Sequence, residues 1–377
     1  MDWETHARRL ADEVVRSESR WHGPLATTPR HVFVPRWWRS GEQGWELRDG
    51  AADTDAWMAS AYADRTLVTR VGALHADDAE PGAVMVPGGY PTSSSTLPGL
   101  VVAMHRHAMV TSDARVLVTT GSGYGTALMC HRLGDDQVTS VDVDPHLVGT
   151  ARDRLASIGL RPHLAAADIT GPLPGEYDRI ISTVSVRPVP TSWLEALRPG
   201  GRLVTTIAGT GLILTADKTA DGGAAGRIQP DPAGFMRARH GVDYGPPANE
   251  VWAVAECGDG EEVTTCRYPL LYPTDAWDVM SMLALAVPDI EYRCQENDDS
   301  RTVWLLHADG SWARATATEF LASPTVHQGG PRRLWRELER IRNRLNRMGT
   351  LPIYGARATI TPDGVLTLSR GGWTATV

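Results

Sequence analysis

The residues best suited to chemistry lie in a short stretch where a glycine-rich turn is followed by an acid. Residues 115–119 and 138–142 are apolar runs typical of buried parallel strands, and residues 123–133 between them predict a helix. Asp142 ends the second run, 21 positions after Gly121. That spacing is close to the one at which a carboxylate meets the ribose hydroxyls of a bound nucleotide. The stretch therefore predicts a nucleotide-binding strand, helix and strand in succession.

The glycines of this turn limit the kind of ligand. A dinucleotide-binding turn has the pattern G-x-G-x-x-G, but the sixth position counted from Gly121 is Thr126. A cradle for a pyrophosphate is thus disfavoured. A nucleoside without phosphates, such as S-adenosylmethionine, needs only a close approach of the backbone at Gly121 and Gly123. The alternative is that both glycines merely shape a turn in an α/β domain without a ligand.

The elements that must position these residues alternate along the chain. Further strands at about 163–167, 178–183 and 202–207, with helices at 145–158 and 190–197, predict a doubly wound, Rossmann-like α/β sheet. Asp168 follows the strand at about 163–167, so we expect it at the same edge of the sheet as Asp142. Residues 212–215 and the glycine-rich turn after them predict an antiparallel hairpin, at which we expect the sheet to end.

The flanking regions complete the predicted organisation. Apolar residues in 3–17 have the spacing of an amphipathic helix. Prolines in 27–35 favour an extended segment there. Residues 87–95 predict a polar loop that precedes a helix. Strands at 251–255, 263–268 and 303–307 and one helix at 332–348 predict an α+β region. We therefore expect a domain of residues 1–245, in which a segment 1–85 packs on an α/β core 86–245, and a C-terminal α+β domain of residues 246–377.

The composition excludes several classes of protein. Of the 377 residues, 42% are hydrophobic and 22% charged, as in ordinary globular proteins, and the net charge of −8 disfavours nucleic acid as a partner. The four cysteines show no C-x-x-C pairing and the histidines no cluster, so we expect neither a metal site nor a disulfide framework. We find no signal peptide and no membrane-spanning apolar run, and expect a cytoplasmic protein that does not bind a membrane.

The helix at 332–348 has an unusual charge. It carries seven arginines and only two glutamates around an apolar stripe. One interpretation is a solvated face that acids elsewhere in the protein balance. The other is a docking site for an acidic peptide, with Arg336 and Arg340 as candidate substrate-binding residues.

Five motifs, in this order, resemble the protein-L-isoaspartate O-methyltransferase family. They are residues 29–35, the Ser/Thr loop that ends at 96–98, and residues 121–124, 138–142 and 198–203, and the match covers about residues 25–210. Residues 57–61, 91–95, 178–183, 235–237 and 328–335, with the added C-terminal region, are similar to longer actinobacterial members of the family. Those members are associated with gene clusters for ribosomally made peptides, namely graspetides and lanthipeptides.

The resemblance implies a class I methyltransferase-like fold with S-adenosylmethionine as cofactor and S-adenosylhomocysteine as product. It places Gly121 and Gly123 under the methionine part of the cofactor, Asp142 on the ribose hydroxyls and Asp168 against the adenine amine. The full cofactor-binding set that it implies is Thr120, Gly121, Ser122, Gly123, Asp142, Val143, Asp168, Ile169 and Thr183.

The Ser/Thr loop supplies the predicted catalytic residues. The family's serine, two positions before a proline, corresponds to Thr96, which keeps the hydroxyl. Ser94, Ser95 and Thr96 are therefore expected to donate hydrogen bonds to a substrate carboxylate, which needs such donors once water is removed. For Ser94 the alternative is a solvated loop position.

Two positions depart from the family pattern. Leu117 and Thr119 stand where relatives carry an acid and a first glycine. A β-branched residue does not adopt the positive φ that a glycine permits, so we expect the loop to sit differently. This departure leaves two possibilities open. The protein binds the cofactor more weakly than its relatives do, or it is a homologue that only binds peptides.

The expected function is that of a carboxyl O-methyltransferase that uses S-adenosylmethionine. The C-terminal region favours methylation of an aspartate in a modified, macrocyclised precursor peptide, followed by closure to an aspartimide. The alternatives are repair of isoaspartate in proteins and a non-catalytic peptide-binding protein. Residues from about 246 onward are expected to recognise the peptide.

Overall fold

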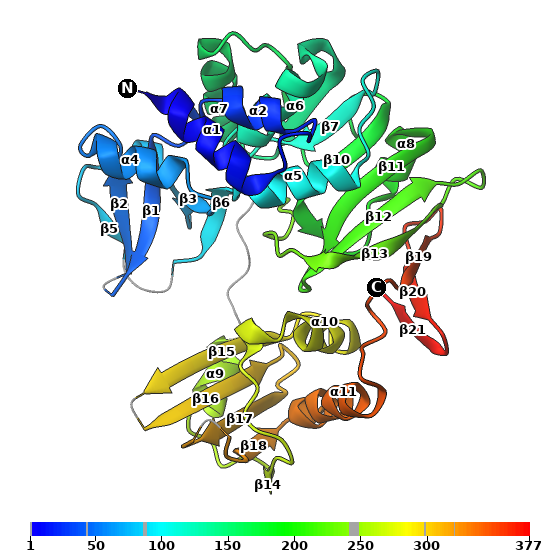
Figure 1. The fold of residues 1–377 in the computed structure, drawn as a ribbon. Helices are drawn as coiled ribbons and strands as arrows, with labels where there is room; N and C mark the ends of the chain where they lie inside the picture. Colours follow the sequence, from blue (N-terminus) through cyan, green and yellow to red (C-terminus); the bar gives the residue numbers. More distant parts are fainter. Residues whose placement is uncertain (1, 43, 86–88, 241–248, 298, 320) are drawn as a thin grey trace.

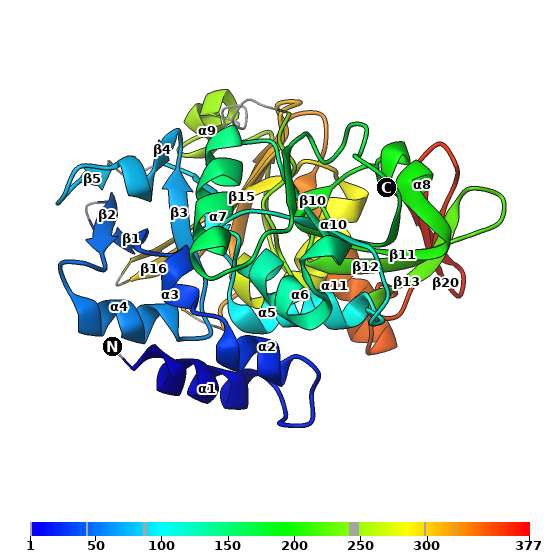
Figure 2. The same ribbon diagram turned by 90° about the horizontal axis from the view of Figure 1, so that it is seen from above.

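The computed structural model describes residues 2–42, 44–85, 89–240, 249–297, 299–319 and 321–377. Within them the strands form three sheets: six strands in the N-terminal part, ten in a central sheet and five in a C-terminal part (Figures 1 and 2). None of the described helices is both long and apolar enough to cross a bilayer.

The central sheet contains the predicted nucleotide-binding unit. Its parallel strands are β7 (Val116–Thr119), β8 (Val138–Asp142), β9 (His163–Ala166), β10 (Tyr177–Val186) and β11 (Leu197–Ile207), in the order β9-β8-β7-β10-β11. The helices between them are α6 (Tyr124–Leu133), α7 (Pro145–Ser157) and α8 (Thr191–Ala196), with a 3₁₀ turn η2 (Asp135–Gln137). The predicted alternation is confirmed. The strand order reverses between β7 and β10, and ligands of open α/β sheets bind at such a reversal.

The end of this sheet differs from the sequence prediction. The hairpin β12 (Leu212–Lys218) and β13 (Ala224–Pro232) forms as expected, but β19 (Arg357–Ile360), β20 (Leu366–Arg370) and β21 (Trp373–Thr376) then extend the sheet beyond it. Ala224 to Arg227 of β13 pair with Ile360 to Arg357 of β19. The prediction that the sheet ends at the hairpin is wrong, because the final strands cover an edge that β13 would otherwise expose.

This pairing also bears on the domain division. The predicted boundary between residues 245 and 246 lies outside the described residues. By strand pairing, however, the last part of the chain belongs to the central sheet and not to a separate C-terminal unit. The C-terminal sheet is therefore built from residues that leave the central sheet after β13 and return to it at β19.

The N-terminal part combines helices with a small antiparallel sheet. Its elements are α1 (Trp3–Val14), α2 (His22–Thr27), α3 (Arg30–Phe33), β1 (Arg36–Gly41), β2 (Gly44–Asp49), α4 (Thr54–Ala61), β3 (Leu67–Val71), β4 (Leu74–His75), η1 (Ala76–Asp78), β5 (Val84–Met85), β6 (Pro91–Ser95) and α5 (Pro98–His107). The sheet order is β4-β3-β1-β2-β5, with β6 paired to β3. The helices α1 and α2 pack near α6, so this part adjoins the nucleotide-binding unit.

Two sequence predictions in this part are wrong. Residues 27–35 are not extended throughout, since α3 begins directly after Pro29, a position at which a missing N–H is tolerated. The polar loop predicted at 87–95 is a strand from Pro91 onward, because this segment pairs antiparallel with β3. Residues 87 and 88 lie outside the described residues.

The C-terminal part is an antiparallel sheet with three helices. Its elements are α9 (Asn249–Ala255), β14 (Glu262–Thr265), η3 (Pro273–Asp275), α10 (Trp277–Ala286), β15 (Glu291–Asn297), β16 (Ser300–Leu306), β17 (Trp312–Ala317), β18 (Thr325–Gly329) and α11 (Leu334–Met348). The strand order is β14-β18-β17-β16-β15. The strand predicted at 251–255 is instead α9, which packs Val251 and Ala255, one helical turn apart, against Trp304 and Trp312. The predicted arginine-rich helix is confirmed as α11.

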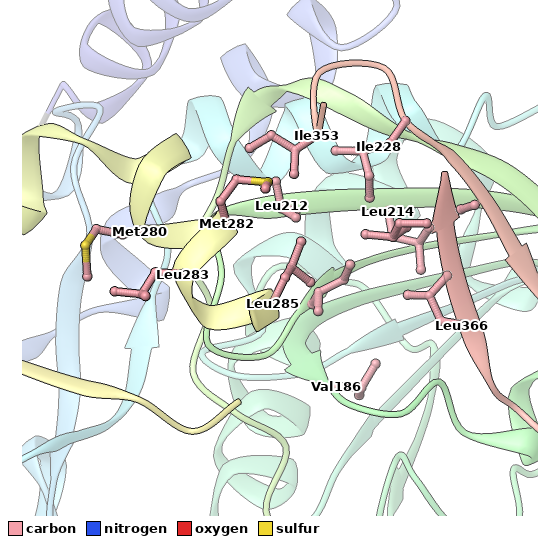
Figure 3. Packing of buried hydrophobic residues seen from close by; sticks show 14 of the residues in the cluster. Val186, Leu212, Leu214, Ile228, Met280, Met282, Leu283, Leu285, Ile353 and Leu366 are labelled. Carbon is pink, nitrogen blue, oxygen red and sulfur yellow. The ribbon is translucent and has the colours of Figure 1, made fainter. Parts of the chain in front are cut away.

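One hydrophobic core joins the central sheet to the C-terminal part. Figure 3 shows Leu212, Leu214 and Ile228 of β12 and β13 beside Met282 and Leu285 of α10, and all five belong to the same buried cluster. The helix α10 was not predicted as a separate element. It is buried on nearly all sides, so it lacks the alternation of polar and apolar residues that marks a surface helix.

A buried histidine lies under the N-terminal helices. His105 of α5 packs against the ring of Trp21, with 4.8 Å between ring centroids, and is 2% exposed. Burial lowers the pKa of His105 from 6.5 to about 3, so the folded protein keeps this ring neutral at neutral and mildly acidic pH.

Acidification should therefore destabilise the fold through His105. As the pH falls from about 7 to about 5, the histidine becomes protonated in the unfolded chain but not in the folded chain. The free energy of unfolding of the wild type should therefore fall by about 2 kcal/mol more than that of His105→Phe. Urea unfolding followed by circular dichroism at the two pH values measures this difference. Equal losses in the two proteins would show that His105 titrates normally when folded.

Candidate functional site

A cavity of about 220 Å³ lies at the carboxyl edge of the central sheet, beside the reversal of strand order. Three parts of the chain line it. The first part is the ends of the parallel strands, which contribute Thr119, Gly121, Val141, Asp142, Val143, Ile169 and Thr183. The second part is β6 and the residues after it, which contribute Thr92, Ser93, Ser94 and Thr96. The third part is residues 234–239, which close the remaining side. We call residues 234–240 the strap.

The glycine turn forms the wall below this cavity. Gly121 has φ of 49° and Gly123 has φ of 90°, values in the left-handed region that glycine adopts without strain. Gly123 is the residue before α6, and a Cβ there would lie 3.1 Å from the Cβ of Ala151 and 3.3 Å from Cδ1 of Phe33. Both glycines are thus required by the backbone path, and the turn presents backbone, not side chains, to a ligand.

Asp142 is held by the turn that it faces. Its Oδ2 accepts a hydrogen bond from the N–H of Gly121 at 3.0 Å, and its Oδ1 accepts one from the N–H of Asp144 at 3.1 Å. Burial raises the pKa of Asp142, while these two N–H groups and the charge of Arg239 act in the opposite direction. Each carboxylate oxygen retains a free lone pair, so the group can still accept hydrogen bonds from two ligand hydroxyls.

Asp168 lies beside the cavity but does not line it. Its Oδ1 accepts hydrogen bonds from the N–H and the hydroxyl of Thr170, at 2.8 and 2.7 Å, and its Oδ2 lies 2.8 Å from Nδ1 of His240 in the strap. Burial alone would raise the pKa of Asp168, but the hydrogen bonds from Thr170 and His240 lower it below the usual value. The predicted contact with an adenine amine would compete with His240, and it stays a prediction.

The two departures from the family pattern fit the fold without strain. Leu117 is fully buried in the core, where an unpaired acid would be costly. Thr119 ends β7 with an ordinary strand backbone, and its hydroxyl accepts from the N–H of Thr183 at 2.9 Å and lies 2.6 Å from the hydroxyl of Thr183. These bonds continue the link between β7 and β10 just beyond Ile181, where their backbone pairing ends. The positive φ of the turn is supplied by Gly121 and Gly123 instead.

The three predicted catalytic residues differ in whether they reach the cavity. Ser94 and Thr96 line it, and together with Ser95 they also line a small space of about 30 Å³ behind the glycine turn. Ser95 lines that small space only, and its hydroxyl is buried without a hydrogen-bond partner among the described residues. Ser94 and Thr96 are therefore the two predicted catalytic residues that a ligand in the cavity can contact.

A buried arginine fixes the position of this segment. Arg30 of α3 is fully buried, and its Nη2 donates hydrogen bonds to the carbonyl oxygens of Ser95 at 3.3 Å and Thr96 at 3.2 Å. The same guanidinium donates to the carbonyls of Ala61, Ala63 and Arg65. Thr96 is therefore held against the cavity through its backbone, which leaves its side chain free for a ligand.

The remaining predicted residues lie away from the cavity. Thr120 and Ser122 face the small space behind the turn, and the hydroxyl of Thr120 lies 2.7 Å from that of Ser140. On α11, Arg336 pairs with Glu262 at 2.7 Å and Arg340 with Glu337 at 2.7 Å. The structure brings neither arginine to the cavity, and their role in substrate binding stays a prediction.

The strap was not identified as part of the site from the sequence. It runs beside the end of β10, where the N–H of Ser185 donates to the carbonyl of Met236 and the N–H of Ala238 donates to the carbonyl of Ser185, both at 2.8 Å. Its Arg237 pairs with Asp289 of the C-terminal part. Residues 235–237 contributed to the family resemblance, but no periodicity marks them as an element, and that motif was the sole signal available.

The lining of the cavity suits S-adenosylmethionine. The glycine backbone allows close approach, Asp142 offers a carboxylate for ribose hydroxyls, and Val143, Leu147 and Ile169 provide apolar walls for a flat base. Ser94 and Thr96 add hydroxyl donors to the same lining, which can hold a carboxylate. The site thus combines a nucleoside-binding edge with an anion-binding one.

Comparison with known proteins gives one family. Residues 83–229 match the family model described as protein-L-isoaspartate(D-aspartate) O-methyltransferase. The protein-L-isoaspartate O-methyltransferase of Azorhizobium caulinodans is 38% identical over 114 residues, which are 29% of this chain and 52% of that protein. The enzyme of the same name from Thermococcus onnurineus is 33% identical over 138 residues, 35% of this chain and 59% of that protein. The chain thus spans little more than half the length of these relatives.

Two solved structures that are similar to this chain carry the same name. One protein-L-isoaspartate O-methyltransferase covers 100% of this chain and 99% of its own, with a TM-score of 0.47 and 16% identity. A putative one from Plasmodium falciparum, in complex with S-adenosyl-L-homocysteine, covers 62% of this chain and 98% of its own, with a TM-score of 0.42 and 12% identity. The strand order and the family match together identify the expected class I methyltransferase-like fold.

Replacing Asp142 tests the nucleoside-binding edge. Asp142→Ala removes charge-assisted hydrogen bonds to two hydroxyls, so it should weaken S-adenosylmethionine binding by about tenfold or more. Isothermal titration calorimetry measures the dissociation constant. Asp153→Ala, an exposed acid on α7, removes the same charge outside the cavity and should bind like the wild type. Wild-type affinity in a folded Asp142→Ala protein would refute the assignment of this edge.

Proposed function

Because residues 83–229 belong to the protein-L-isoaspartate O-methyltransferase family, we propose that the protein is a carboxyl O-methyltransferase that uses S-adenosylmethionine and acts on a peptide. One observation carries the proposal. Gly121 of the glycine turn, Asp142, Ser94 and Thr96 all line one cavity, at the point where the strand order reverses.

The chemistry requires placement more than proton transfer. The cofactor supplies a methyl group on a positively charged sulfur, which a carboxylate attacks without the help of a general base. The chain's own residues have two tasks. Gly121 and Asp142 hold the cofactor, at its methionine part and its ribose respectively, and Ser94 and Thr96 donate hydrogen bonds to the incoming carboxylate as it loses water. Arg30 keeps the backbone of Thr96 in place during this exchange.

Thr96 is the hydroxyl donor that we assign to the substrate carboxylate. Thr96→Ala and Thr96→Val remove one hydrogen bond to a charged group and should lower kcat/KM by about tenfold or more, whereas Thr96→Ser should keep most of the activity. Steady-state kinetics at saturating cofactor give these values, and calorimetry should show unchanged cofactor binding. Full activity of Thr96→Val would exclude this role.

For the substrate we propose an aspartate side chain in a modified, macrocyclised ribosomal peptide. The methyl ester that forms makes the aspartyl carbonyl a better electrophile. The backbone nitrogen of the next residue then attacks that carbonyl, loses its proton and expels methanol, which leaves an aspartimide. The C-terminal sheet with its helices supports this proposal, since it lies outside the matched segment 83–229 and offers a surface for a larger substrate.

Repair of isoaspartate is the second candidate function, and the names of the relatives favour it. In that case the succinimide hydrolyses and part of the isoaspartate returns to aspartate. The accommodation of Leu117 and Thr119 in the fold argues against the third alternative, a peptide-binding protein with a decayed cofactor pocket.

A direct assay separates the two enzymatic candidates. The full chain is incubated with S-adenosylmethionine and either a linear isoaspartyl peptide or a macrocyclic peptide that contains aspartate, and mass spectrometry follows the gain of a methyl group and the later loss of methanol. We expect methylation of the macrocycle and little turnover of the isoaspartyl peptide. Turnover of the isoaspartyl peptide alone would establish repair, and turnover of neither would reject both.

A further inference from the structure

A second hollow lies between α10, α11 and β21. It has a volume of about 720 Å³ and shares no lining residue with the cavity at the glycine turn. Met282 and Leu285 of α10 and Trp373 of β21 give it an apolar floor, and Arg340, Arg344 and Arg347 of α11 form its rim. In Figure 1, α10 and α11 lie next to the C-terminal strands. We call this hollow the α11 groove.

The arginines of α11 fall into two groups. Near its start, Arg332, Arg333 and Arg336 are neutralised by Asp309, Glu261 and Glu262, at 3.0, 2.6 and 2.7 Å. Near its end, Arg344 and Arg347 are exposed and form no ion pair with any residue in the described ranges. Acids of the protein therefore balance the first group, while the second group keeps its charge at the groove.

The spacing of the groove arginines directs them to one side. Arg340, Arg344 and Arg347 are four and three positions apart, so they follow one face of the helix. Arg340 is bonded to Glu337, which leaves a net positive rim. The chain as a whole carries a net charge of −8, so its overall field repels anions. A negatively charged ligand is thus attracted to this groove in preference to most of the surface.

The third wall of the groove is a free sheet edge. Among the described residues, β21 pairs with β20 alone, and it is the terminal strand of the central sheet. Residues 373–376 of β21 also line the groove. The outer N–H and C=O groups of such a strand can bond to an added extended segment.

We propose that the α11 groove binds an extended, acidic segment of the peptide substrate, which adds a strand to β21. Carboxylates of that segment contact Arg344 and Arg347, and its apolar side chains, which alternate with the acids, lie on Met282, Leu285 and Trp373. The inference rests on the proposed function only in that it takes a peptide as the ligand. The proposed binding site in the groove is separate from the cavity in which methyl transfer occurs.

Peptide binding can be measured without any methyl transfer. The probe is a short dye-labelled peptide of alternating glutamate and valine, titrated with the full chain and followed by fluorescence anisotropy. We expect binding that weakens as salt is added and no binding of the matching lysine and valine peptide. The variant Arg344→Gln/Arg347→Gln should bind the acidic peptide about tenfold more weakly. The variant Arg8→Gln/Arg9→Gln removes two exposed charges from α1 and should bind like the wild type.

The backbone contact has its own test. A version of the acidic peptide that is N-methylated at alternate residues loses the donors along one edge, and it should bind about tenfold more weakly if its N–H groups pair with β21. Undiminished binding of both possible N-methylated versions would overturn strand addition. Equal binding of the acidic peptide to Arg344→Gln/Arg347→Gln and to the wild type, or no binding to either, would overturn the groove assignment.

The two proposals can fail separately. Binding of the acidic peptide without methylation of any tested substrate would reject the proposed function and leave the groove assignment intact. Methylation by a protein that does not bind the acidic peptide would do the reverse. Calorimetry with S-adenosylmethionine on the arginine variant, which should match the wild type, confirms that the cavity at the glycine turn is undisturbed.

Discussion

The site depends on one buried cation. The guanidinium of Arg30 donates to five backbone carbonyls, two of which belong to Ser95 and Thr96 and three to the end of α4 and the residues after it. Burial lowers the pKa of Arg30 to about 10, so it stays charged at neutral pH. Without it, these carbonyls would be left without partners in the interior, which costs about 1–3 kcal/mol for each unsatisfied group. Arg30 thus couples the N-terminal part to the edge of the central sheet.

The cavity exists because three distant segments meet there. The parallel strands provide the glycine turn and Asp142, β6 brings Ser94 and Thr96 from the small N-terminal sheet, and the strap closes the side next to β10. Backbone hydrogen bonds hold the strap and β6, and Arg30 holds the residues at the end of β6. The strap is joined to the C-terminal part by the ion pair of Arg237 and Asp289, which connects the lining of the cavity to that part.

Local patterns in the sequence were sufficient for the nucleotide-binding unit. The apolar runs around Gly121 and Asp142 predicted their strands, because short parallel strands and their turns depend on neighbouring residues. The pairing of β13 with β19 could not be predicted, since it joins residues more than a hundred positions apart with no pattern in common. The helix α9 was mistaken for a strand because its few residues are apolar and β-branched, and its contacts with Trp304 and Trp312 decided otherwise. The strap has no periodicity at all and is defined by its bonds to Ser185.

The return of the chain to the central sheet at β19 makes the C-terminal part an insertion between neighbouring strands. Its two ends join the sheet side by side, at β13 and β19, and the shared core packs α10 onto that sheet. Shortening the chain from its end would strip β19 to β21 from the sheet before it removed the inserted part. A single proteolytic cut in either connection would leave both parts associated through the other connection and the shared core. The central sheet and the C-terminal part are therefore joined both by two chain connections and by one shared core.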